Sequence, residues 1–194
     1  MLIMTLANKI TSARFLLTVL YFILLALTLN RRDVAVMTAA FVLFNVIAWS
    51  DLLDGFLARR YGQVTHFGRI ADPLVDKILV CGSFIFFLRI DPLPRVIPAW
   101  FVVVVLAREF LVSGIRGAAE AAGIPFGATF WGKQKTFVQN ATVGTALGFA
   151  AWLPEKRWTE ILTVVLVWLT LVSTVVSGAT YVMDARRLLK SERV

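Results

Sequence analysis

The sequence predicts an all-α integral membrane protein, with six transmembrane helices and a short N-terminal interfacial segment in one domain spanning residues 1–194. Of the 194 residues, 59% are hydrophobic and 16% are charged, and the mean hydropathy is +0.79. Soluble domains have about 45–50% apolar and about 25% charged residues. The apolar residues form six long runs, each close to the roughly 20 residues that span a bilayer. Polar segments, or segments with glycine or proline, separate these runs as turns separate helices.

The first half of the chain predicts the interfacial segment and three spanning helices. Residues 2–10 are apolar but too short to cross a bilayer, so we expect them to lie along its interface. The first helix, residues 13–29, ends at a charged turn with two arginines and an aspartate. The second, residues 34–57, ends at a polar connection, and the third, residues 70–89, ends just before two prolines.

The second half predicts three more spanning helices. Residues 95–119 include a valine-rich run that would also suit a strand, but the length of the segment and its lack of alternation favour a helix in lipid. This helix ends before a glycine and a proline. Residues 136–153 form the fifth helix, which stops at Pro154, and residues 159–182 form the sixth, which is followed by several basic residues.

The basic residues predict how the chain sits in the membrane. The formal net charge is +8, and 14 of the 20 Lys and Arg residues fall at the termini, in the second and fourth connections and at the adjoining helix ends. Because cytoplasmic segments are enriched in Lys and Arg, both termini are expected to face the cytoplasm. No long basic run of the nucleic-acid-binding kind is present, so the bilayer is an expected partner and nucleic acid is not.

Four aspartates lie at the facing ends of the second and third helices, where acids are unexpected. Asp51 and Asp54 are three residues apart, and Asp72 and Asp76 are four apart, so each pair lies on one helix face. The short connection makes the two helices antiparallel neighbours, and the pairs can converge. A charge at the centre of a spanning helix costs about 2.5–3.5 kcal/mol on insertion scales. The acids are therefore either partly protonated or hold divalent cations, and all-oxygen ligands suit Mg²⁺ or Mn²⁺.

Two other interpretations of the acids remain open. The first is that they are ordinary helix-end acids facing the cytoplasm, which becomes less favourable for four acids at these spacings. The second is a divalent-cation transporter, since acids inside membranes often mark ion pathways. A transporter would distribute acids across the bilayer depth and contain an inverted repeat. The acids cluster at one side, and no repeat is visible in the sequence.

The residues between the aspartates suit a nucleotide or phosphate ligand. Gly55 and Ala58 are small, and they either allow close helix packing or leave room for a flat ligand. Arg59 could bind a phosphate through two parallel hydrogen bonds. His66 is close in sequence and is the alternative to an aspartate as a catalytic base, but it is expected in the connecting loop.

This segment resembles the signature of the CDP-alcohol phosphotransferase family, D-x-x-D-G-x-x-A-R-x8-G-x-x-x-D-x-x-x-D. The eight fixed positions are Asp51, Asp54, Gly55, Ala58, Arg59, Gly68, Asp72 and Asp76. The N-terminal Asn8, Thr11 and Arg14 also resemble the family's N-x-x-T-x-x-R pattern, although Ala7 stands where a proline is often found.

The resemblance implies a role for each of these residues. The four aspartates would hold two metal ions, Mg²⁺ or Mn²⁺, and Asp76 would also act as general base. CDP-diacylglycerol would be bound by the remaining signature residues and the N-terminal pattern: Asn8, Thr11, Arg14, Gly55, Ala58, Arg59 and Gly68. The resemblance also implies a homodimer in the bacterial inner membrane, with the active site facing the cytoplasm.

Three further stretches resemble the bacterial phosphatidylglycerophosphate synthases of this family, which use sn-glycerol 3-phosphate as acceptor. They are residues 107–116, residues 132–136 with Gln139 one turn on, and residues 72–77, which end in Lys77. Four basic residues of the first two stretches could neutralise the acceptor phosphate, namely Arg108, Arg116, Lys133 and Lys135. The two lysines would alternatively only fix the topology, and Arg116 would alternatively pair with Glu109 on the same helix face.

The resemblance therefore implies transfer of the phosphatidyl group from CDP-diacylglycerol to sn-glycerol 3-phosphate, giving phosphatidylglycerophosphate and CMP. Inositol phosphate, serine and phosphatidylglycerol remain alternative acceptors within the family.

Overall fold

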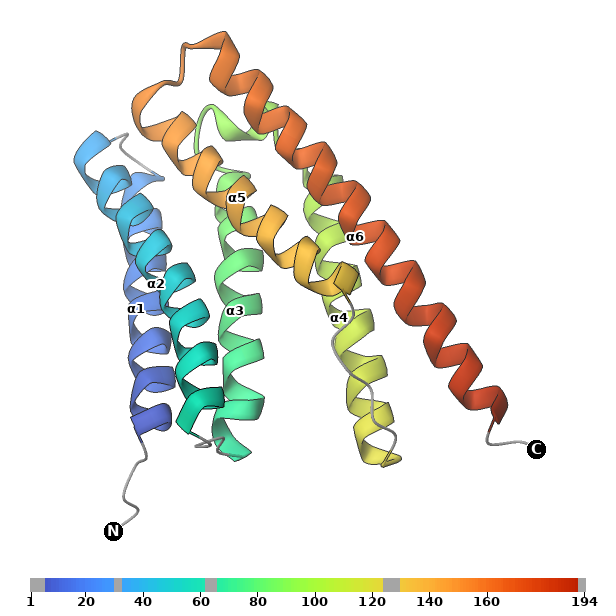
Figure 1. Ribbon diagram of the computed structural model, residues 1–194. Coiled ribbons are helices and arrows are strands. Elements are labelled where there is room, and N and C mark those ends of the chain that lie inside the picture. Colours follow the sequence, from blue (N-terminus) through green and yellow to red (C-terminus); the bar gives the residue numbers. More distant parts are fainter. Residues whose placement is uncertain (1–5, 30–32, 62–65, 124–129, 192–194) are drawn as a thin grey trace.

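The computed structural model describes residues 6–29, 33–61, 66–123 and 130–191, and within these ranges the regular secondary structure is all helical, joined by short turns. It forms six α-helices and one short 3-10 helix, with no strand in the described ranges (Figure 1). The elements are α1 (Leu6–Thr28), α2 (Val34–Tyr61), α3 (His66–Phe87), η1 (Leu93–Arg95), α4 (Ala99–Ala121), α5 (Phe130–Trp152) and α6 (Arg157–Ser191).

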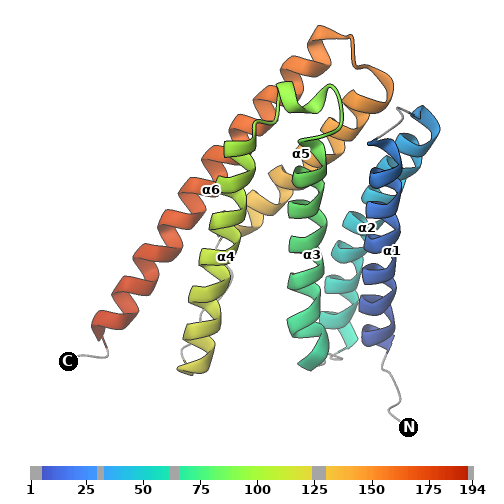
Figure 2. The same ribbon diagram turned by 180° about the vertical axis from the view of Figure 1, so that it is seen from behind.

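The helices run up and down, so that α1 begins and α6 ends at the same end of the bundle (Figure 1). The end of α2, the start of α3 and the end of α4 also lie at this end. Helix α1 packs against α2 and α3, while α5 packs against α2 and α6. Helix α4 packs against α6 and α3. Figure 2 shows from behind that α5 and α6 are tilted relative to the upright group of α1, α2 and α3.

Local capping decides several of the helix ends. Helix α2 starts at Val34, as predicted, because Oδ1 of Asp33 accepts hydrogen bonds from the backbone N–H groups of Ala35 and Val36, at 2.8 and 3.2 Å. Helix α4 starts at Ala99 rather than residue 95, because Pro98 takes an extended conformation before it. Gly123 follows the last turn of α4 with φ of +73°, a conformation that glycine adopts without strain.

Four helices start earlier than predicted, and three run further. Residues 6–10 form the beginning of α1, so this part of the predicted interfacial segment is continuous with the first helix. Helix α5 begins at Phe130 rather than residue 136, and α6 continues to Ser191 rather than residue 182. The prediction that His66 lies in a loop is also wrong, because α3 begins at this residue.

The outer faces of all six α-helices carry large apolar side chains. Examples are Leu16, Phe110 and Phe137, whose side chains are 68%, 74% and 75% exposed. Soluble monomers rarely expose apolar surface of this extent, whereas helices facing lipid do. Residues 11–28 and 157–186 are also long and apolar enough, by length and composition, to cross a membrane. The distribution is that of a membrane protein.

Close packing of α1 on α3 fixes the two helices relative to each other. Gly82 of α3 faces Phe22 of α1, and a Cβ atom at this glycine would lie only 2.3 Å from Phe22 Cζ. The ring of Phe22 stacks on Phe86, with the ring centroids 5.6 Å apart. At the adjoining residues of the two helices, the Tyr21 hydroxyl is 2.8 Å from Ser83 Oγ, and both residues are buried. This contact aligns the polar first half of α1 with the start of α3.

Candidate functional site

Two carboxylates of the signature lie on one face of α3, near the end of the bundle where the chain starts. Asp72 and Asp76 are one helical turn apart, and their side chains are 44% and 32% exposed. Partly exposed carboxylates keep access to water and ligands. Their spacing confirms the expectation that both lie on a single helix face.

The polar residues of α1 hold these two carboxylates. Thr11 donates a hydrogen bond of 2.7 Å from Oγ1 to Oδ1 of Asp72. Arg14 donates from Nη2 to Oδ1 of Asp76, and its Nη1 lies 4.0 Å from Oδ1 of Asp72. Thr11 and Arg14 are themselves only 5% and 3% exposed. The α1–α3 interface therefore orients both aspartates through the two residues that the N-terminal pattern singled out.

Several other predicted site residues, those for the metal and the donor together with Lys133 for the acceptor, have positions on helices, but their side chains are not among those that the structure describes. Asn8 belongs to α1, Gly68 to α3 and Lys133 to α5. The rest belong to α2, namely Asp51, Asp54, Gly55, Ala58 and Arg59. Among the side chains that the structure describes, no three His, Cys, Asp or Glu residues form a metal-binding group. The four-aspartate metal site therefore stays a prediction, to which Asp72 and Asp76 contribute the hard oxygen donors that Mg²⁺ and Mn²⁺ prefer.

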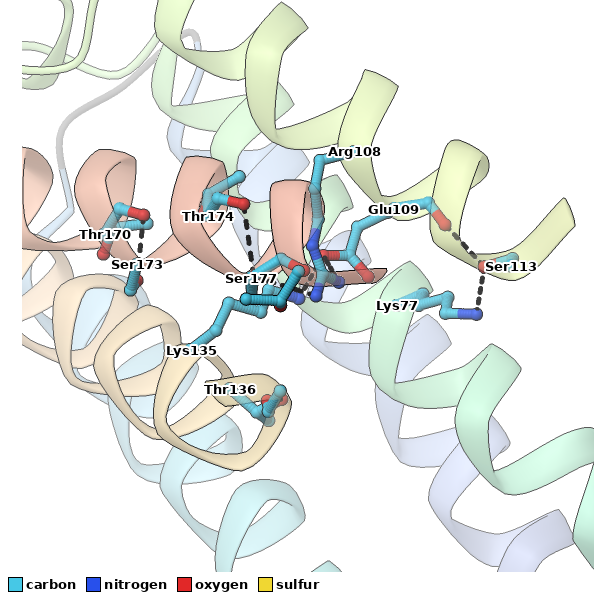
Figure 3. Close-up of polar contacts among 12 residues, drawn as sticks. Lys77, Arg108, Glu109, Ser113, Lys135, Thr136, Thr170, Ser173, Thr174 and Ser177 are labelled. Atoms are coloured by element: carbon cyan, nitrogen blue, oxygen red, sulfur yellow. Dashed lines mark hydrogen bonds and ion pairs between the residues drawn. The ribbon is translucent and has the colours of Figure 1, made fainter. Parts of the chain in front are cut away.

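A second polar cluster lies between α4, α5 and α6 (Figure 3). Its centre is Glu109, whose Oε1 accepts from Lys135 Nζ of α5 and from Arg108 Nη1 at 3.2 Å. All three residues are buried, with side-chain exposures of 7%, 6% and 10%. Arg108 Nη2 also donates to Ser177 Oγ of α6 at 2.9 Å. One carboxylate and two cations are thus enclosed by three helices, which is costly in an apolar region unless they are paired.

Tyr181 of α6 extends the cluster towards Arg116. The guanidinium carbons of Arg108 and Arg116 lie 5.7 and 5.5 Å from the centre of its ring, within the range of a cation–π contact. Glu109 takes Arg108 and Lys135 as its ion-pair partners. The alternative pairing of Glu109 with Arg116 is therefore wrong, and Arg116 brings a further positive charge to the cluster.

Lys77 of α3 connects this cluster to the aspartates. It follows Asp76 in the sequence, but its Nζ points to α4 and donates to Ser113 Oγ at 2.5 Å (Figure 3). The Ser113 hydroxyl in turn donates to the backbone carbonyl of Glu109. Two consecutive residues of α3 therefore face the carboxylate site and the cation cluster, respectively.

Several buried polar atoms of the cluster region lack a hydrogen-bond partner in the described part of the chain. They are Arg108 Nε, Gln139 Nε2 and Thr174 Oγ1. Gln139 is one turn beyond Lys135, and Thr174 is one turn before the Ser177–Tyr181 segment. Such atoms are donors that a polar ligand could satisfy.

Ser113, Ser177 and Tyr181 are site residues that were not predicted from the sequence. The available signal was the spacing of polar residues along α6, where buried hydroxyls recur at intervals of three, four or seven residues within an apolar helix: Thr163, Thr170, Thr174, Ser177 and Tyr181. Part of this stripe binds α5, since Thr142 Oγ1 and Thr170 Oγ1 lie 2.7 Å apart. The spacing predicts a buried polar face, but it does not distinguish helix pairing from ligand binding.

Comparison with known proteins assigns the class. The sequence profile of the CDP-alcohol phosphatidyltransferase family matches residues 4–176, which include both halves of the signature and the cation cluster up to Thr174. The chain belongs to this family.

Particular relatives of the chain come from several bacteria. A CDP-diacylglycerol–glycerol-3-phosphate 3-phosphatidyltransferase of Bacillus subtilis (strain 168) is 32% identical over 194 residues, covering 96% of this chain and 97% of its own. One of the same name from Rickettsia felis is 31% identical, covering 91% of this chain and 92% of its own. A third, from Shigella flexneri serotype 5b, is 34% identical over 76% of this chain and 79% of its own.

Proposed function

We propose that the chain transfers the phosphatidyl group from CDP-diacylglycerol to sn-glycerol 3-phosphate, giving phosphatidylglycerophosphate and CMP. The observation that carries this proposal is the link between the two polar sites on α3. Asp76 contacts Arg14 on one side, and Lys77 contacts Ser113 beside the Glu109 cluster on the other. A carboxylate site for donor chemistry therefore adjoins a cationic site that suits a phosphorylated acceptor. The names of the bacterial relatives support the same substrates.

In the proposed reaction Asp76 is the general base. Its carboxylate takes the proton from the 1-hydroxyl of sn-glycerol 3-phosphate as that oxygen attacks the β-phosphorus of CDP-diacylglycerol. The bond from this phosphorus to the oxygen of CMP breaks, and CMP leaves with the electron pair. Thr11 and Arg14 keep the two α3 carboxylates oriented. Asn8, Gly55, Ala58, Arg59 and Gly68 would accommodate the CDP group.

The metal ions are part of the proposal. Asp51, Asp54, Asp72 and Asp76 would hold two divalent ions, Mg²⁺ or Mn²⁺, which would neutralise the diphosphate and stabilise the departing CMP. The all-oxygen donor set and the partial exposure of Asp72 and Asp76 support this assignment.

The charge of the cation cluster supports a phosphate ligand. Arg108, Arg116 and Lys135 contribute three positive charges, and Glu109 contributes the one negative charge found among the described residues of the cluster. Arg108 and Lys135 are buried and Arg116 is partly buried, and an excess of positive charge in such a place is costly without an anion. The phosphate dianion of the acceptor would balance it, with Lys133 as a further proposed contact.

Placement in the membrane follows from the same proposal. Six transmembrane helices would span the bacterial inner membrane as one domain, with both termini and the aspartate site on the cytoplasmic side. The exposed apolar faces and the distribution of Lys and Arg support this orientation. A homodimer is included on the family resemblance.

The test is CMP release by the purified protein from CDP-diacylglycerol with a panel of acceptors. We expect sn-glycerol 3-phosphate to give the highest kcat/KM, above inositol phosphate, serine and phosphatidylglycerol. A preference for any of those three would place the chain elsewhere in the family. Protein inactivated at all four aspartates provides the background rate.

A further inference from the structure

We propose that Lys77 is a binding residue for the phosphate of the acceptor, placed between the catalytic carboxylate and the cation cluster. This inference rests on the proposed function and adds a residue to its acceptor site. The first supporting observation is the direction of the Lys77 side chain. Asp76 and Lys77 are consecutive on a helix, about 100° apart around its axis, so Lys77 points to α4 while Asp76 points to α1.

The ammonium group of Lys77 has a neutral partner. It donates to the Ser113 hydroxyl, and the ion pairs among the described residues join Arg14, Arg108 and Lys135 to carboxylates but do not include Lys77. An ammonium has three donor positions, so a lysine in a partly enclosed place with one hydroxyl partner retains two donors for a ligand. Its charge is also uncompensated by any carboxylate of the described chain within ion-pair distance.

The Ser113 contact places this charge at the edge of the cluster. Ser113 is four residues after Glu109 and donates to its backbone carbonyl, so the Lys77 ammonium contacts α4 one helical turn after the residue whose carboxylate binds Arg108 and Lys135. The α4 side of the site thus faces α3 with a cation next to the residue assigned as general base. A phosphate bound there would leave the rest of a three-carbon acceptor to reach Asp76.

The summed charge of the site favours an acceptor that carries a doubly negative group over a neutral acceptor. Lys77 raises the positive charges of the combined site to four, with Arg108, Arg116 and Lys135, against Glu109. A phosphate monoester carries close to two negative charges at neutral pH. The chemical group recognised by Lys77 is therefore a phosphate monoester rather than an uncharged hydroxyl compound.

The experiment compares Lys77→Gln with the wild type in the purified full-length chain. Loss of one charge-assisted contact should raise the KM for sn-glycerol 3-phosphate roughly ten- to hundredfold, while the KM for CDP-diacylglycerol changes little. Inorganic phosphate, used as a competitor of the acceptor, should lose affinity by a similar factor. Lys156→Gln is the matched control, because Lys156 is exposed at the opposite end of the bundle, and it should leave both KM values unchanged.

The remaining variants separate binding from a structural link between α3 and α4. Lys77→Arg keeps the charge and should retain most of the affinity for the acceptor, and Lys77→Met replaces the Gln variant if that variant does not fold. An unchanged KM for the acceptor, or equal rises in both KM values, would overturn the role of Lys77. Wild-type protein that prefers an acceptor without a phosphate would instead overturn the proposed function, and this inference with it.

Discussion

Replacement of Arg14 separates two roles that the N-terminal pattern could have. The family resemblance implies contact with CDP-diacylglycerol, whereas the structure brings the guanidinium to Asp76 and near Asp72. Arg14→Gln removes the charge and keeps a polar side chain. Removing one partner of a fully buried ion pair costs about 3–5 kcal/mol. The Asp76 side chain is 32% exposed, so water can solvate the released carboxylate, and the cost should be closer to the about 1.5–3 kcal/mol of one charge-assisted hydrogen bond.

This loss should appear in kcat. If Arg14 orients the general base, about 1.5–3 kcal/mol corresponds to a roughly ten- to hundredfold lower kcat, with a nearly unchanged KM for CDP-diacylglycerol. Arg14→Lys should recover part of the rate, because an ammonium keeps the charge but lacks the planar donor pair that reaches both aspartates. The assay is CMP release at saturating acceptor and metal, with Arg157→Gln, at the opposite end of the bundle, as control.

The opposite kinetic pattern would refute the positioning role. A large rise in the KM for CDP-diacylglycerol with an unchanged kcat would mean that Arg14 acts on the nucleotide. Thermal unfolding of each variant in detergent controls for a general loss of stability.

The remaining predictions concern the carboxylates and the acceptor site. Replacing any one of Asp51, Asp54 and Asp72 with asparagine should lower the rate of CMP release more than about tenfold at saturating metal, a loss above about 1.4 kcal/mol. A smaller loss would mean that the replaced aspartate is not an essential metal ligand. Asp76→Asn should reduce turnover to about a hundredth or less while bound metal and CDP-diacylglycerol affinity persist, and their joint collapse would make Asp76 chiefly a ligand. Arg116→Ala and Lys135→Ala should each raise the KM for sn-glycerol 3-phosphate roughly ten- to hundredfold, and equal changes for both substrates would indicate a structural role instead.

Hydrophobic patterning predicted the number and order of the helices but not their ends. The ends depend on caps and on paired charges, which average hydropathy does not register. Lys135 illustrates the difference, because its charge lowers the average hydropathy of the residues around it and so predicts the end of a membrane helix there. In the structure Lys135 is buried in α5, because its ammonium group donates a hydrogen bond to the carboxylate of Glu109 of α4, and α5 begins before it at Phe130. Pro98 had the opposite effect by delaying the start of α4.

The site was predictable where helical spacing determines geometry and not where partners come from other helices. The four-residue spacing of Asp72 and Asp76 was enough to place both on one face of α3. Their contacts with Thr11 and Arg14 join residues that are 61 and 62 positions apart in the sequence, and no local sequence pattern predicts contacts over such a separation. The same applies to Glu109, for which Arg116 was the alternative partner on the same helix face. Glu109 pairs instead with Arg108 beside it and with Lys135 of α5, which is 26 positions away in the sequence.

The most direct test of the account is the transfer of labelled sn-glycerol 3-phosphate into lipid by the purified protein. In the presence of CDP-diacylglycerol and Mg²⁺ or Mn²⁺, we predict one labelled phosphatidylglycerophosphate for each CMP released, and loss of both products when the metal is chelated. Release of CMP without label in the lipid would contradict the account, as would undiminished transfer in the absence of divalent metal.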